Sequence, residues 1–225
     1  MTYNPGEQEQ AAVFASDLRD VAPLRLIEPL ARTLGAFEGI SSAIEYSYVD
    51  VVKMAGHACP TTAAAYECCR AALSRLYPDE TPVRGQIEVT VYGEPDDGTY
   101  GVIGQVFGLI TGAATETGFK GLATFFRRQN LLKYESAGAD ATGMLFRFKR
   151  MDNGKVVQCR LIPDRMPPPA PEDAKRLSEL MRKVLWEAAK TDEIAEFHKL
   201  WRRHVTAVFE SAKRDHPWLS IQEEK

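Results

Sequence analysis

The dipeptide Asn153-Gly154 lies between two runs of alternating apolar and polar residues, and it constrains the fold more than any other feature. Asn-Gly favours the positive φ angles of the tightest β-turns, so it predicts a hairpin with a two-residue turn centred on these residues. The runs are residues 144–150 and 155–162, whose apolar side chains should share one face of a sheet. Cys159 lies among them, so we expect it to be a core residue rather than a metal ligand.

Two further runs, residues 44–53 and 83–92, have the β-branched and aromatic composition of strands. Apolar residues at helical spacing predict helices at residues 7–20, 23–34 and 61–76. Helices interspersed with strands, followed by a hairpin, indicate an α+β fold.

Glycines 104, 108 and 112 recur four residues apart, so on a helix they would form one smooth stripe. We expect this stripe to permit close packing of the helix against its neighbours. Room for a ligand beside the backbone is the alternative.

A proline-rich linker at residues 163–171 precedes two amphipathic segments, residues 171–190 and 192–213. These segments predict a C-terminal helical hairpin. The chain would then consist of an α+β domain, residues 1–165, with the hairpin of residues 166–225 packed on it. Histidines 198 and 204 lie on the hairpin and His216 follows it; we expect them to be surface residues or satisfied by hydrogen bonds.

Composition excludes several classes of function. The net charge of −3 gives no global attraction to nucleic acid, and 44% apolar with 26% charged residues is typical of a soluble globular protein. The most apolar window, residues 102–114, is too short to span a bilayer. Residues 1–10 lack the apolar core of a signal peptide, and the four cysteines then predict a reducing, cytoplasmic setting.

The candidate functional site is the turn Gly56-His57-Ala58-Cys59-Pro60, between a predicted strand and a predicted helix. His57 and Cys59 are two residues apart, so a tight turn can direct both at one metal ion. Pro60 suits a first helical position, which makes Cys59 the N-cap, where the helix dipole favours the thiolate. A buried cysteine and a hydrogen-bonded histidine at a structural corner form the alternative.

The stretch Val51-Val52-Lys53-Met54-Ala55-Gly56-His57-Ala58-Cys59-Pro60 resembles the E-subunit family of formylmethanofuran dehydrogenase, which has a Gly-His-x-Cys-Pro turn. Gly104-Gln105, Leu109-Ile110-Thr111-Gly112-Ala113-Ala114 and Gly118-Phe119-Lys120-Gly121-Leu122 are similar to a second, looser stretch of that family. The resemblance covers about residues 25–165. It implies an α-β-α-β-β-β core with a mixed sheet, a metal, usually zinc, at His57 and Cys59, and a homodimer.

The chain departs from the family's pattern at three places. Ala113 stands where the family has a cysteine, and Thr99 and Tyr100 stand near a second one. The helical hairpin replaces the zinc-ribbon tail of some members. Only His57 and Cys59 therefore carry over as metal ligands, and a second subunit, water, a small ligand or a carboxylate such as Glu94 or Asp97 would complete the coordination.

Three functions remain open at the level of sequence. The first is a metal-binding protein whose open site accepts water or a small molecule. The second is an enzyme, in which either a metal-bound water attacks a small substrate or Cys59 is the nucleophile and His57 its base. Residues two apart rarely reach the geometry that a nucleophile and its base need, so the metal-bound water is favoured. The third is a protein-interaction module with a structural metal. No substrate is indicated.

Overall fold

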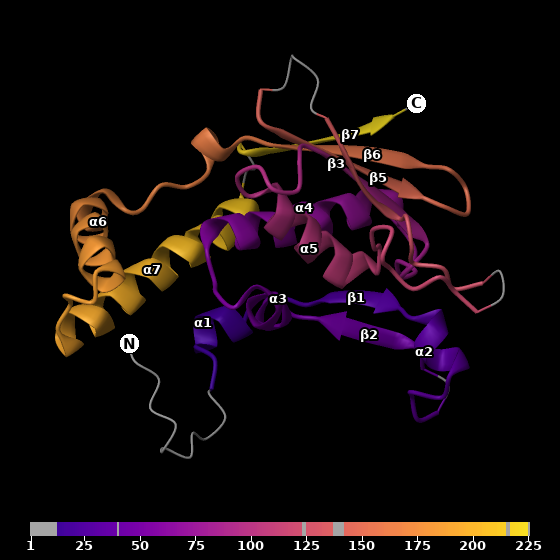
Figure 1. The fold of residues 1–225 in the computed structure, drawn as a ribbon, viewed down its shortest axis with the longest axis horizontal. Helices are drawn as coiled ribbons and strands as arrows, with labels where there is room; N and C mark the ends of the chain where they lie inside the picture. Colours follow the sequence, from indigo (N-terminus) through magenta and orange to yellow (C-terminus); the bar gives the residue numbers. More distant parts are fainter. Residues whose placement is uncertain (1–12, 40, 123–124, 137–141, 215–216, 225) are drawn as a thin grey trace.

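A five-stranded mixed sheet, a central helix and a two-stranded ribbon are stacked in that order in the computed structural model (Figure 1). The structure describes residues 13–39, 41–122, 125–136, 142–214 and 217–224. The predicted α+β class and the mixed sheet are confirmed.

The large sheet has the strand order β4-β3-β5-β6-β7. Its strands are β3 (Ile87–Tyr92), β4 (Leu132–Glu135), β5 (Met144–Arg150), β6 (Val156–Leu161) and β7 (Leu219–Glu224). Strands β3 and β4 are parallel, and the other neighbours are antiparallel. Alternate residues of β5 are buried, so one face of the sheet packs on the core and the other meets water.

The predicted hairpin is confirmed as β5 and β6, with Phe146 opposite Cys159, which is buried. The two-residue turn is wrong. The Arg150 N–H donates to the Lys155 carbonyl, so residues 151–154 form a longer turn. The guanidinium of Arg150 holds the Asp152 carboxylate at 2.7 Å within that turn, which favours the longer connection over a tight Asn-Gly turn.

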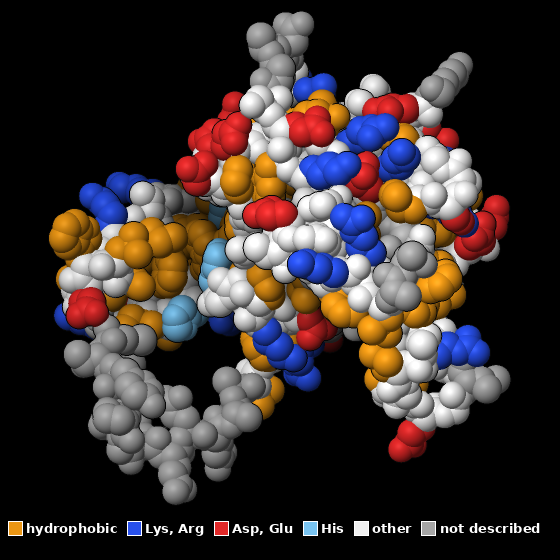
Figure 2. Space-filling view, turned by 45° about the vertical axis from the view of Figure 1, so that its right-hand side comes forward, with side chains coloured by type: hydrophobic (Ala, Val, Ile, Leu, Met, Phe, Trp, Pro, Cys, Tyr) orange, Lys and Arg blue, Asp and Glu red, His pale blue; other side chains and the backbone are white. Residues whose placement is uncertain are grey.

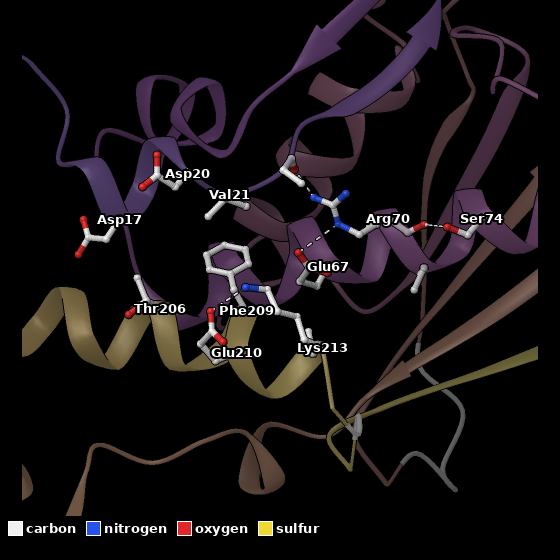
Figure 3. A pocket seen from close by; sticks show the side chains of 13 residues that line it. Asp17, Asp20, Val21, Glu67, Arg70, Ser74, Thr206, Phe209, Glu210 and Lys213 are labelled. Carbon is white, nitrogen blue, oxygen red and sulfur yellow. Dashed lines mark hydrogen bonds and ion pairs between the residues drawn. The ribbon is translucent and has the colours of Figure 1, made fainter.

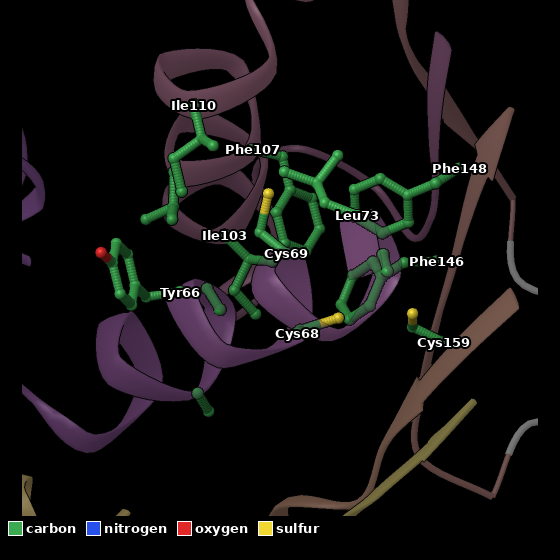
Figure 4. Packing of buried hydrophobic residues seen from close by; sticks show 14 of the residues in the cluster. Tyr66, Cys68, Cys69, Leu73, Ile103, Phe107, Ile110, Phe146, Phe148 and Cys159 are labelled. Carbon is green, nitrogen blue, oxygen red and sulfur yellow. The ribbon is translucent and has the colours of Figure 1, made fainter. Parts of the chain in front are cut away.

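Helix α4 (Pro60–Leu76) is the centre of the molecule, and it confirms the predicted helix at 61–76. Four successive positions, Ala63 to Tyr66, are all fully buried, so every side of the helix is covered. Its neighbours are the sheet, helix α5 (Tyr100–Thr111) and helix α7 (Thr191–Ala212). Figure 4 shows Cys68 and Cys69 of α4 among the phenylalanines of α5 and β5.

The glycine stripe of α5 serves close packing, as predicted. A Cβ atom on Gly104 would lie 2.1 Å from the Tyr134 hydroxyl, and one on Gly108 would lie 2.9 Å from the Ala113 carbonyl. Only glycine therefore fits at these two positions without movement of the neighbours.

The predicted helix at residues 23–34 is wrong in its first half. Residues Leu24–Ile27 form strand β1, which pairs antiparallel with β2 (Ala43–Tyr46). A short helix, α2 (Pro29–Thr33), follows, because Pro29 suits a first helical position and the Glu28 side chain accepts the Leu30 N–H.

The predicted strand at residues 44–53 is wrong in its second half, where α3 (Tyr48–Ala55) replaces it. Ser47 and Asp50 form a capping box, in which each side chain accepts the backbone N–H of the other. The candidate turn therefore follows a helix rather than a strand. Of the helix predicted at 7–20, residues 7–12 lie outside the described residues, and α1 comprises only Ser16–Arg19.

The C-terminal helical pair is confirmed as α6 (Pro171–Leu185) and α7, after a 3-10 turn, η1 (Pro163–Arg165). Val205, Val208 and Phe209 of α7 belong to the main core, and β7 pairs with β6. The segment beyond residue 165 thus contributes to both the core and the sheet. Within the described ranges, no helix combines the length and the apolar character needed to cross a bilayer.

Candidate metal centre

The candidate turn joins the end of α3 to the start of α4. Gly56 ends α3 in the left-handed conformation, at φ 75°, and its N–H donates to the Val52 carbonyl. Cys59 is the N-cap of α4, as predicted, with Pro60 at the first helical position. The Cys59 sulfur accepts the Thr62 N–H at 3.4 Å, and the Thr62 hydroxyl accepts the Cys59 N–H at 3.1 Å. The sulfur is thereby held at the positive end of the helix.

His57 is exposed, and one hydrogen bond orients its ring. Nδ1 lies 2.9 Å from the carbonyl oxygen of Ala55. A carbonyl oxygen only accepts, so Nδ1 carries the proton, and in the neutral ring the lone pair is then on Nε2. Histidines that bind metals commonly have this arrangement, because a backbone carbonyl on one nitrogen sets the tautomer and leaves the other to the metal.

Tyr48 of α3 supports the backbone beneath Cys59. Its hydroxyl lies 2.9 Å from the Thr62 hydroxyl and donates to the Cys59 carbonyl at 3.4 Å. Burial raises the pKa of Tyr48, so the phenol remains a neutral donor. Its ring packs edge-to-face on Phe209, with 4.8 Å between centroids, which links the turn to α7.

Trp201 of α7 makes a contact that the sequence did not reveal. Its indole N–H donates to the Ala58 carbonyl at 2.7 Å, at the residue between His57 and Cys59. A half-buried tryptophan is expected to find an acceptor, but nothing in the sequence indicates which one. The C-terminal hairpin therefore holds the turn directly.

Figure 2 shows histidine side chains along the junction between the α6–α7 pair and the rest of the molecule. His198 and His204 lie one helical turn before and after Trp201. His198 is exposed, whereas His204 bonds through Nε2 to the Pro167 carbonyl at 3.2 Å, and its buried Nδ1 has no hydrogen-bond partner among the described residues. Burial lowers the pKa of His204. His216 lies outside the described residues.

In the part of the chain that the structure describes, no three His, Cys, Asp or Glu side chains come together as a metal site. Glu94 and Asp97 are exposed on the loop before α5, where Glu94 accepts the Ser136 hydroxyl, so neither joins His57 and Cys59. Ala113 lies beyond the end of α5, where its N–H donates to the Thr111 hydroxyl. This chain supplies two candidate protein ligands at the turn.

Cys59 is also the only cysteine that solvent reaches. All four cysteines are free, and Cys68, Cys69 and Cys159 are buried. Burial raises the pKa of Cys68 and Cys69, so these two remain thiols.

Comparison with known proteins adds no assignment: no family model matches the chain, and no curated protein matches its sequence.

Proposed function

We propose that this chain is a metal-binding protein, a divergent member of the formylmethanofuran dehydrogenase E-subunit family, with zinc at His57 and Cys59. The observation that carries the proposal is the hydrogen bond from His57 Nδ1 to the Ala55 carbonyl, which leaves Nε2 available. A thiol two residues away, held at a helix N-terminus, supplies the second donor. Imidazole and thiolate are ligands that zinc prefers and that magnesium and calcium do not.

The proposed coordination is open. Two protein ligands are fewer than either a structural or a catalytic zinc site uses, so water or a small molecule would complete it. The exposure of His57 agrees with access from solvent. An accessory or sensory role suits such a site, and a metal-dependent enzyme acting on a small molecule is the second candidate. A cysteine nucleophile with His57 as its base is disfavoured, because no hydrogen bond joins the two side chains among the described residues.

A cytoplasmic location and a homodimer are parts of the same proposal. Four free thiols suit a reducing compartment. The glycine stripe of α5 does not support the dimer, because Tyr134 packs on Gly104 and the Ala113 carbonyl packs on Gly108 within the same chain. Phe119, Leu122, Phe125 and Met151 are instead exposed apolar residues, as expected of a surface that a second copy covers.

Metal analysis of the purified chain, loaded with zinc and freed of excess, tests the central claim. We expect one zinc per chain in the wild type and a strong loss of zinc in Cys59→Ser. A serine hydroxyl is a good N-cap, so this variant should keep α4 and its circular dichroism spectrum. His57→Gln should also lose zinc.

The matched control is His198→Gln, which removes an exposed histidine from α7 and should leave the zinc content unchanged. A wild-type protein that retains no zinc, or a Cys59→Ser variant at full occupancy, would show that the turn is only a structural corner.

A further inference from the structure

Strand β4 forms one edge of the large sheet, and part of its main chain faces away from β3. The Val89 N–H donates to the Leu131 carbonyl, and Val89 lies opposite Leu132. Main-chain groups alternate in direction along a strand, so those of Lys133 face β3 and those of Tyr134 face outward. Among the described residues, neither the N–H nor the carbonyl of Tyr134 has a partner on the outer side. The edge is therefore able to pair with another strand.

The solvent face of this edge carries one side chain of each charge. Tyr134 packs on Gly104 on the core face, so Lys133 and Glu135, which flank it, share the opposite face. Lys133 pairs with Glu88 at 2.7 Å within the sheet. Glu135 is exposed, and it has no ion-pair partner among the described residues. Its carboxylate remains available to a partner strand.

The two charges select one way of pairing this edge with a second copy of itself. A two-fold axis pairs the two strands antiparallel, and the residue on the axis sets the register. An axis at Lys133 or at Glu135 places two like charges directly opposite each other, which is destabilising. An axis at Tyr134 places Lys133 of each copy opposite Glu135 of the other. The outward main-chain groups of Tyr134 then bond to those of the partner's Tyr134, as an antiparallel pair requires.

The surface beside β4 agrees with a partner of this kind. Lys133 lines the same hollow as Phe125 and Met151, whose side chains are exposed apolar groups. A second copy paired on β4 would lie next to this hollow and would reduce the contact of these side chains with water.

A cavity of about 790 Å³ between α1, α4 and α7 is a weaker candidate for a contact with a partner (Figure 3). Figure 3 shows its two cationic side chains already paired, Arg70 with Glu67 and Lys213 with Glu210. Its walls are largely helices, whose main-chain groups bond within each helix. The cavity therefore lacks the free main-chain groups that β4 presents.

We infer that two copies of this chain join their β4 strands antiparallel about a two-fold axis at Tyr134, with Lys133 of each copy paired with Glu135 of the other. The inference rests on the homodimer of the proposed function and specifies its contact. The two large sheets become one continuous sheet, and the Leu132 carbonyl accepts the N–H of the partner's Ser136.

Two charge reversals, measured separately and as a mixture, test this register. Lys133→Glu and Glu135→Lys should each raise the dissociation constant of the dimer about tenfold to a hundredfold, because two attractive pairs per dimer become repulsive. Mixing the two variants in equal amounts should restore the dimer, since every pair across the axis is then attractive again. Sedimentation equilibrium gives the dissociation constants, and an affinity tag on one variant identifies the mixed dimer.

The matched control is Lys149→Glu. Lys149 lies on the same face of the sheet and opposite Glu88, but on the interior strand β5. Its reversal changes the net charge as Lys133→Glu does, and it should leave the dissociation constant of the dimer unchanged. Circular dichroism of all three variants shows whether each keeps its fold.

Amide hydrogen exchange at Tyr134 gives a second readout, on the main chain itself. The Tyr134 N–H should exchange slowly in the wild-type dimer and rapidly in Lys133→Glu at a concentration where that variant is monomeric. The Glu135 N–H faces β3, so it is an internal reference that should stay protected in both.

A dimeric wild type with a rapidly exchanging Tyr134 N–H, or with reversals that leave the dissociation constant unchanged, would overturn this inference while the homodimer itself stands. Reversed variants that stay monomeric when mixed, although folded, would overturn it too. A wild type that is monomeric at every concentration would remove both the homodimer and its contact. Zinc content is a separate measurement, so the metal proposal is judged independently.

Discussion

At the scale of single residues, Glu28 is a buried carboxylate that pairs with two arginines. Its carboxylate is 4% exposed and accepts from Arg84 at 2.8 Å and from Arg128 at 2.6 Å. Arg84 also donates to the carbonyls of Leu109 and Ile110 at the end of α5, whose dipole offsets part of the surplus positive charge. Arg128 is 7% exposed, and burial lowers its pKa while Glu28 opposes that effect.

Glu28→Gln should therefore destabilise the fold by roughly 3–5 kcal/mol, because it leaves two guanidinium groups close together without their counter-charge. Urea denaturation followed by circular dichroism measures the change in the free energy of unfolding. Glu45→Gln, at an exposed position on the neighbouring strand β2, is the matched control and should stay within about 0.5 kcal/mol of the wild type. A Glu28→Gln variant as stable as the control would mean that water screens the charges of Glu28, Arg84 and Arg128.

At the scale of elements, the sequence predicted the helices and strands that are stabilised by interactions within their own segment. Helix α4 was predictable because Pro60 opens it and its alanines favour a helix that packs closely. Strand β1 was not predictable from the sequence, because the spacing of Leu24 and Ile27 also fits a helix. The pairing of Leu24 with Tyr46 in β2 makes this segment a strand, and the sequence of the segment does not indicate that partner.

The candidate site also has one part that the sequence predicted and one part that it did not. The N-cap role of Cys59 follows from its neighbours in the chain and was predictable. The Trp201–Ala58 hydrogen bond joins residues far apart in the sequence and was not. Strand β7 was missed for the same reason, since only its pairing with β6 distinguishes it from a polar tail.

Trp201→Phe should destabilise the protein by about 1 kcal/mol, because the Ala58 carbonyl loses its donor while most of the aromatic packing remains. If the zinc proposal is correct, zinc affinity should fall as well, since the turn between the ligands is then held less firmly. Denaturation and a competition titration with a zinc indicator measure the two effects.

Trp186→Phe is the matched control, because Trp186 is 82% exposed at the end of α6. It should change neither quantity. Equal zinc affinities in Trp201→Phe and Trp186→Phe would show that α7 does not position the turn.

At the scale of the whole molecule, two of the exposed apolar residues, Phe125 and Met151, line a hollow of about 410 Å³ beside the edge strand β4. Phe125 is 68% exposed at its rim, and Met151 approaches from the β5–β6 turn. An unpaired strand edge next to apolar side chains is a surface that soluble proteins usually cover.

We therefore expect the homodimer to use this surface, and Phe125→Glu should convert it to a monomer without loss of helical content. Light scattering at several protein concentrations gives the mass of each form. Val13→Glu, which changes an exposed apolar residue elsewhere, is the control and should remain dimeric. A wild-type mass equal to one chain at every concentration would remove the dimer from the proposal.

The hydrogen bond between Trp201 and Ala58 has a spectroscopic consequence. Indole emission responds to the polarity and the hydrogen bonding of the ring, and this ring donates to the peptide group between the two candidate ligands. Of the other two tryptophans, Trp186 points into solvent and Trp218 is buried against Ser211, so neither senses the turn. The chain thus contains a fluorophore of its own at the proposed metal centre, and its emission would report whether zinc binds there.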